Sequence, residues 1–96
     1  MKVTVRLLFG PLPREAVVRT VDVPEGSTVV DATRAAAAVV QDRVCCSKDD
    51  VWAIDGVATD VQRERYWYWM LNGRPGPEMP YRHVLQDGDA VEWRYN

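Results

Sequence analysis

The stretch from residue 65 to residue 73 constrains the fold of this chain most strongly. It reads RYWYWMLNG, a run of strand-favouring residues followed by Asn-Gly, a strong signal for a tight turn. Because side chains alternate along a strand, Trp67 and Trp69 share one face, and Tyr66 and Tyr68 share the other. Both faces are apolar and both need cover, which is typical of a central strand in a sheet.

The first half of the chain predicts two strands and one helix. Residues 2–9 alternate between apolar and polar side chains, and residues 16–23 form a second strand after a short break, so we expect an antiparallel hairpin. Thr28, with Asp31 three residues later, fits a helix capping box. The alanine-rich sequence that follows predicts a helix to about residue 42.

The second half of the chain predicts three strands, including the aromatic stretch. Residues 51–54 end in Asp-Gly, and residues 90–95 alternate after another Asp-Gly turn. We expect residues 57–63 to be a polar connection and residues 74–80, with three prolines, to be an ordered loop rather than a strand. The predicted order is β-β-α-β-β-β. It indicates one α+β domain, residues 1–96, with a β-grasp-like mixed sheet on one helix and the last strand parallel to the first.

The composition of the predicted helix orients the aromatic strand. Small alanine side chains leave room for large rings, so we expect Trp67 and Trp69 to lie in the core beneath the helix. Their expected neighbours there are Ala32, Ala36 and Val40. The two tyrosines would then face the wetter side, where phenol hydroxyls reach water or a ligand. Loss of the Trp69 ring should cost about 3–5 kcal/mol of stability, and loss of a tyrosine ring much less.

Composition and charge exclude several classes of function. The net charge of −2 offers no basic surface for a nucleic acid or an anionic membrane. No apolar run could span a bilayer and no signal peptide is visible, so we expect a cytoplasmic protein unless an export signal was trimmed. The single histidine, His83, gives no nucleophile–base pair, so we expect no catalysis and no required cofactor.

The two cysteines, Cys45 and Cys46, are neighbours. A disulfide between adjacent cysteines closes a strained eight-membered ring, so we expect reduced thiols, with a reactive or metal-binding role as the alternative. Their number excludes a four-thiolate metal site. The acidic residues between positions 49 and 60 lack the spacing of a calcium loop, so we expect a solvated loop and no metal there.

The ordered set of these signals resembles a known family. The residues that carry the resemblance are EGSTVVDA at 25–32, Ile54-Asp55-Gly56, Tyr66-Trp67, Asn72-Gly73 and DGDAV at 87–91. In this order and at these spacings they resemble the transcobalamin C-terminal-like domain, a β-grasp domain, over nearly the whole chain. In the vitamin B12 carriers of that family the small domain packs over the corrin ring, and a larger helical domain closes from the other side.

The resemblance implies a non-catalytic domain that binds a corrinoid or another flat or cyclic ligand. The residues that it places toward the ligand are Asp50, Val51, Trp52, Tyr66 and Trp67. The wetter face of the aromatic strand adds Tyr68 to this set. Rings on that strand would provide a stacking platform for the ligand.

A protein-interaction module is the alternative function. Its exposed aromatic face would dock onto another chain or onto a second copy in a homodimer, since aromatic residues and arginine are common interface anchors. A third interpretation is that both faces of the aromatic strand are core, one covered by the helix and the other by loops.

Overall fold

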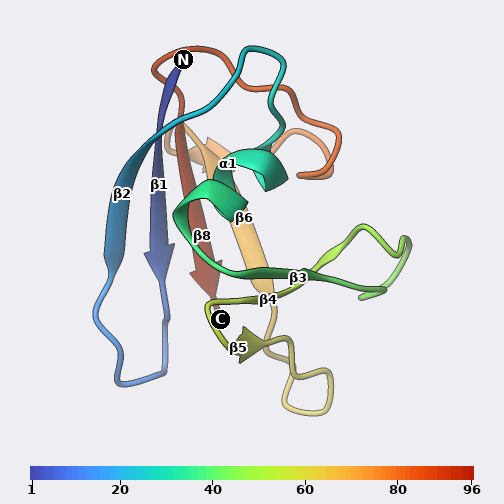
Figure 1. Ribbon diagram of the computed structural model, residues 1–96. Helices are drawn as coiled ribbons and strands as arrows, with labels where there is room; N and C mark the ends of the chain where they lie inside the picture. Colours follow the sequence, from blue (N-terminus) through green and yellow to red (C-terminus); the bar gives the residue numbers. More distant parts are fainter.

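The computed structural model describes all 96 residues and consists mostly of strands, with a single short helix (Figure 1). The elements in chain order are β1 (Lys2–Leu8), β2 (Val17–Asp22), α1 (Val29–Ala36), β3 (Val39–Gln41), β4 (Val51–Ile54), β5 (Val57–Ala58), β6 (Trp67–Leu71), β7 (Arg74–Pro75) and β8 (Ala90–Tyr95). The expected α+β class is confirmed. No helix is long and apolar enough to cross a membrane.

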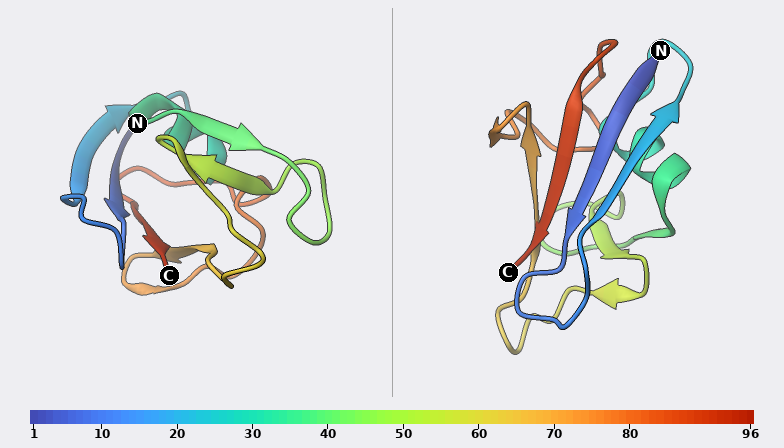
Figure 2. Two further views of the ribbon diagram at one scale, coloured as in Figure 1. Left: turned by 90° about the horizontal axis from the view of Figure 1, so that it is seen from below. Right: turned by 90° about the vertical axis from the view of Figure 1, so that its left-hand side faces the viewer.

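Five strands form the larger sheet in the order β2-β1-β8-β6-β7. Strands β1 and β2 pair antiparallel, and β8 lies beside β1 and parallel to it, which confirms both predicted pairings. Strand β6 pairs antiparallel with β8, so the aromatic strand is internal. The helix and the remaining strands lie on one side of this sheet only, as the right-hand view of Figure 2 shows.

The second sheet, in the order β3-β4-β5, was not expected from the sequence. The helix ends at Ala36 instead of continuing to about residue 42, because Ala37 is extended and Val39 pairs with Ile54 in β4. A neighbouring strand thus overrides the helix propensity of the alanine run. Val40, which we expected on the inner side of the helix above the two tryptophans, lies in β3 instead and is 54% exposed.

Two further strands correct the expected connections. Strand β5 lies in the segment predicted as a polar connection, and it pairs with β4 across the Asp55-Gly56 turn. Strand β7 lies in the proline-rich segment and pairs with the end of β6 across the Asn72-Gly73 turn. Pro75 is tolerated there because β7 is the edge of the sheet, where a missing N–H costs no ladder bond.

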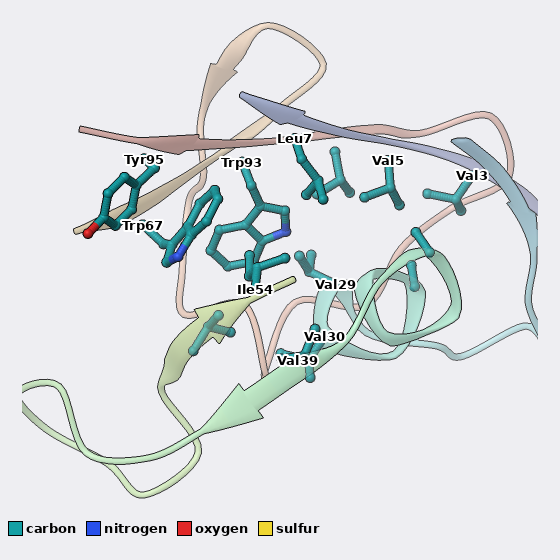
Figure 3. Packing of buried hydrophobic residues seen from close by; sticks show 14 of the residues in the cluster. Val3, Val5, Leu7, Val29, Val30, Val39, Ile54, Trp67, Trp93 and Tyr95 are labelled. Carbon is teal, nitrogen blue, oxygen red and sulfur yellow. The ribbon is translucent and has the colours of Figure 1, made fainter. Parts of the chain in front are cut away.

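The core lies between the larger sheet and the layer formed by α1 and the second sheet (Figure 3). Trp93 of β8 is 1% exposed, and its indole N–H donates to Oγ1 of Thr33 in α1 at 2.9 Å. Trp67 packs edge-on against Phe9 and beside Tyr95, with ring centroids 5.8 and 5.1 Å apart. The ring beneath the helix is therefore Trp93, and not the pair from the aromatic strand.

The two faces of β6 differ as predicted, with one correction. Trp67 is buried and Tyr68 is 53% exposed, so the tryptophan side is the core side. Trp69 is only half-buried, and it lies under the segment that follows β7 rather than under α1. Its indole N–H donates to the carbonyl of Glu78 at 3.0 Å. The expected loss of 3–5 kcal/mol for removing a buried ring therefore applies better to Trp93 than to Trp69.

Candidate functional site

The loop between β3 and β4 is folded around one carboxylate, that of Asp50 (the loop extends from the body of the molecule in Figure 1). Its Oδ2 accepts backbone N–H bonds from Val44, Cys45, Cys46 and Ser47, each at 3.2 Å. Successive N–H groups that converge in this way form a concave anion site, and here the anion is a side chain of the same loop. Asp50 is only 3% exposed, so it does not belong to a solvated acidic loop as the sequence suggested.

The charge of Asp50 is stabilised by this arrangement. Burial raises the pKa of the carboxyl group, but the backbone N–H groups of Cys45, Cys46, Ser47 and Val44 together outweigh that effect. The pKa of Asp50 therefore lies below its ordinary value of 3.8, and the group is ionised at neutral pH. No ion pair involves Asp50, so its charge is balanced by backbone dipoles alone.

Cys45 and Cys46 are joined by a disulfide, contrary to the expectation of reduced thiols. The two backbone N–H groups bond the same oxygen of Asp50, which holds this part of the chain in a tight turn. A turn imposed by a buried carboxylate is not visible in the spacing of the cysteines. The prediction of reduced thiols considered only the two neighbouring residues, and not the turn around Asp50 in which they lie.

A cavity of about 180 Å³ lies between this loop and the inner face of strand β6. Its lining residues are Val44, Cys45, Asp50, Val51, Thr59, Tyr66, Trp67, Trp69, Met79, Pro80 and Trp93. The floor of the cavity is formed by buried residues. The rim is formed by the lining residues that are exposed or half-buried, which are Val44, Cys45, Tyr66, Trp69 and Met79. The walls are mainly apolar and aromatic.

Three tryptophans wall the cavity, and each one uses its indole N–H within the protein. Trp67 donates to the carbonyl of Val57 at 2.9 Å, while Trp69 and Trp93 donate to Glu78 and Thr33 as described above. These bonds fix the ring orientations and leave only ring surface for a ligand. Polar recognition in the cavity is therefore left to side chains other than the tryptophans.

Two buried oxygen atoms of lining residues have no hydrogen-bond partner. They are Oδ1 of Asp50 and Oγ1 of Thr59. Thr59 is 5% exposed and follows β5, where its backbone N–H donates to the carbonyl of Trp52. An unpaired buried polar group costs about 1–3 kcal/mol, so native proteins rarely leave one without a partner. Both oxygens are covered by surrounding protein atoms, although the two residues line the cavity.

The structure brings four of the six predicted site residues to this cavity: Asp50, Val51, Tyr66 and Trp67. Trp52 is half-buried but does not line it, because alternation along β4 turns its side chain away from that of Val51.

Tyr68 lies on the opposite face of the sheet, in a shallow groove with Leu8 and Met70. It therefore does not share the cavity with the other predicted residues.

Sequence reasoning missed several lining residues, of which Thr59 and Met79 are the most informative. Trp69 could have been found, because it shares a strand face with Trp67. Thr59 lies in the segment predicted as a polar connection, and Met79 lies in the proline-rich loop. Nothing local marks either residue as part of a site, because each reaches the cavity through long-range packing.

A metal site is not formed by these residues. No group of three or more histidine, cysteine, aspartate and glutamate side chains is close enough to hold a metal ion. Both cysteines are in the disulfide, and Oδ2 of Asp50 is occupied by the loop. The arrangement can therefore bind a small group by shape and hydrogen bonding, and it contains no paired acid and base.

The fold and the cavity define a small α+β domain with an aromatic-walled recess beside a buried carboxylate. The chain belongs to the family of the Domain of unknown function DUF4430, whose model matches residues 26–96. No curated protein matches the chain.

Two solved structures share the fold. Haptocorrin in complex with Cbi has a TM-score of 0.79 at 16% sequence identity, over 100% of this chain and 25% of that one. A protein from Ruminococcus gnavus described as metal binding has a TM-score of 0.75 at 15% identity, over 99% of this chain and 95% of that one. This chain therefore spans a quarter of the haptocorrin chain but nearly all of the bacterial one. At these identities the likeness is one of fold.

Proposed function

We propose that this chain is a non-catalytic ligand-binding domain of the β-grasp, transcobalamin-like type, and that its ligand is a corrinoid or another flat or cyclic small molecule. The observation that carries the proposal is the aromatic-walled cavity beside the loop that holds the buried carboxylate of Asp50. The ordered motifs in the sequence and the shared fold with haptocorrin, which was solved with Cbi, support the choice of ligand.

The size of the cavity defines how such a ligand would bind. Pockets that enclose a drug-sized ligand measure about 300–1,000 Å³, whereas a cavity of about 150 Å³ holds a benzene molecule. The cavity here, at about 180 Å³, admits one side group rather than a macrocycle. The ring of the ligand would lie on the rim, against Tyr66 and Met79, and one substituent would enter the cavity.

The description of the Ruminococcus gnavus protein as metal binding does not transfer to this chain. A metal site needs several ligands in one place, and no such cluster exists here. Asp50 alone cannot supply the coordination of a hard cation, so an organic ligand fits the site better.

Tryptophan fluorescence provides the test. Three of the four tryptophans line the cavity, so titration with cobinamide should give a saturable change in emission. Free tryptophan, titrated in parallel, corrects for light absorbed by the corrinoid. Tyr66→Ala, on the rim, should weaken binding, whereas Tyr68→Ala, on the opposite face, is the matched control and should not. A flat corrected titration up to ~1 mM cobinamide would remove corrinoids as the ligand.

A second candidate is protein interaction or self-association through the outer face of the larger sheet. Tyr68 and Val18 are 53% and 60% exposed there, and neither α1 nor the second sheet covers this face. Light scattering over a dilution series tests self-association. A mass that stays monomeric at the highest concentration would exclude the homodimer, and a Tyr68→Ala variant with an unchanged mass would exclude this residue as an anchor.

A further inference from the structure

The disulfide between Cys45 and Cys46 lies at the edge of the cavity. Both cysteines are exposed residues of the loop that extends from the body of the molecule (Figure 1), and thiol–disulfide exchange requires such access. Cys45 also lines the cavity, together with Val44 and Asp50 of the same loop. One accessible covalent bond is therefore attached directly to the cavity wall.

The two cysteines supply two of the four N–H groups that hold the carboxylate of Asp50. The eight-membered ring that the disulfide closes contains the peptide bond between Cys45 and Cys46, so the ring limits backbone rotation between these residues. With that rotation limited, both N–H groups stay directed to Oδ2 of Asp50. Reduction opens the ring and restores the rotation.

The rest of the loop does not replace this constraint. Its other long-range bonds lie close to the strands, where the N–H of Asp42 donates to the carbonyl of Asp50 at 2.9 Å and the side chain of Gln41 donates to the carbonyl of Asp49 at 2.8 Å. The bonds to Oδ2 of Asp50 are the only hydrogen bonds of either cysteine. The disulfide and the carboxylate thus hold this part of the loop together.

We propose that Cys45 and Cys46 form a redox switch for the cavity, in which the disulfide keeps the loop closed around Asp50 and reduction by a dithiol releases the loop. The proposal rests on the proposed function, since it names a regulation of the same site. Release would free Val44 and Cys45, which form one part of the rim.

The chemistry of the switch is thiol–disulfide exchange. A thiolate of the reductant attacks one cysteine sulfur, and the electron pair of the broken S–S bond stays on the other sulfur, which takes up a proton. The second thiol of the reductant then displaces the first cysteine. The protein gains two electrons and two protons, and the reductant leaves as a disulfide. A small disulfide of the same class reverses the reaction.

The closed loop couples the disulfide to the charge of Asp50. A carboxylate oxygen accepts N–H bonds more strongly than a neutral amide oxygen does. Coupling between two sites is reciprocal, so a charge that holds the loop closed also favours the disulfide. The wild-type protein should therefore resist reduction more than a variant that is neutral at position 50.

Redox equilibration tests this coupling. The protein is incubated with mixtures of reduced and oxidised dithiothreitol, and its free thiols are counted by mass after alkylation. Asp50→Asn should be reduced about tenfold more readily, which corresponds to about 30 mV for a two-electron couple. Asp49→Asn removes the neighbouring exposed charge, outside the cavity, and should be reduced like the wild type. Equal equilibrium constants for Asp50→Asn and the wild type would contradict the coupling.

The wild-type protein gives a second readout that does not depend on the folding of a variant. After reduction, the backbone N–H signals of the four residues that bond Asp50 should shift in a nitrogen–proton NMR spectrum, while those of β2, at the far edge of the larger sheet, should stay in place. The pKa of Asp50 should rise toward its ordinary value of 3.8. If neither changes, the disulfide is a static link and the proposal is wrong.

The effect on the ligand is measured with Cys45→Ser/Cys46→Ser, because a free thiol reagent could itself bind the metal of cobinamide. This double variant cannot close the ring, so it should bind cobinamide about tenfold more weakly than the oxidised wild type. If both bind cobinamide equally, the switch does not control the site and the proposal is wrong, while the ligand-binding function stands. If neither binds cobinamide but both loop tests succeed, the switch stands and the ligand belongs to another class.

Discussion

The two sides of strand β6 carry similar aromatic residues but lie in opposite environments. Trp67 is 9% exposed, contacts Phe9 and Tyr95, and has its indole N–H paired with a backbone carbonyl. Tyr68, the next residue, is 53% exposed and faces a shallow groove. The aromatic content of a strand therefore does not identify the residues that bind a ligand. Their surroundings decide it, and only the inner side combines rings with buried, unpaired polar atoms.

The largest expected effect comes from the ring that anchors the inner side. Trp93→Ala should lower the free energy of unfolding by about 3–5 kcal/mol, because it leaves a cavity beneath the helix and removes the hydrogen bond that the Thr33 hydroxyl accepts from the indole. Trp93→Phe should cost less because much of the ring volume remains. Urea denaturation of the two variants checks this order. If Trp93→Ala costs no more than Tyr68→Ala, the inner and outer sides do not differ as described.

A smaller effect is expected where the inner side is covered only by a loop. In Gly76→Ala the new Cβ would overlap the ring of Trp69, so the ring or the loop must move. The variant should lose about 1–3 kcal/mol of stability. In a nitrogen–proton NMR spectrum it should also shift the indole N–H signal of Trp69 more than that of Trp93. Pro77→Ala, at the exposed neighbouring position, is the control and should leave both signals in place. An unchanged Trp69 signal in Gly76→Ala would contradict this packing.

The pH dependence of stability should distinguish Asp50 from exposed carboxylates. Its pKa is depressed in the folded state, so its contribution is present above the ordinary value of 3.8 and is lost as pH falls through the lower, folded value. Asp50→Asn should remove that part of the acid sensitivity, whereas Asp49→Asn should not. Denaturation curves between about pH 5 and pH 2 measure the difference. Parallel curves for wild type and Asp50→Asn would show that the loop does not stabilise the charge.

The smallest effect is expected on the outer side of β6. Tyr68→Ala removes an exposed ring and should change stability by no more than about 0.5 kcal/mol, and it should leave cobinamide binding unchanged. Urea denaturation checks the first point, and the fluorescence titration checks the second. A loss comparable to that of Trp93→Ala would mean that the outer side is covered, for example by a second copy of the chain.

Local patterns predicted the elements whose signals are short-range. The alternation in β1 and β8, the Asp55-Gly56 and Asn72-Gly73 turns, and the start of the helix all agree with the sequence. Asp55 and Asn72 have the positive φ angles that such turns require, and the capping box at Thr28 is formed in both directions. These features depend on neighbouring residues only, so one sequence suffices to find them.

The sequence by itself determined the α+β class, the alternation of the main strands and the positions of the tight turns, because period and turn chemistry act locally. The parallel pairing of the first and last strands and the buried side of β6 were also predicted, from the order of the elements and the composition of the helix. Only the tertiary structure decided where the helix ends, since Val39 gains a strand partner in β4. It also decided that Asp50 is buried and that Asp50 and Thr59 line the same cavity. Burial and hydrogen-bond partners arise from residues distant in the chain, and in this protein they turn an acidic loop residue into the centre of a candidate binding site.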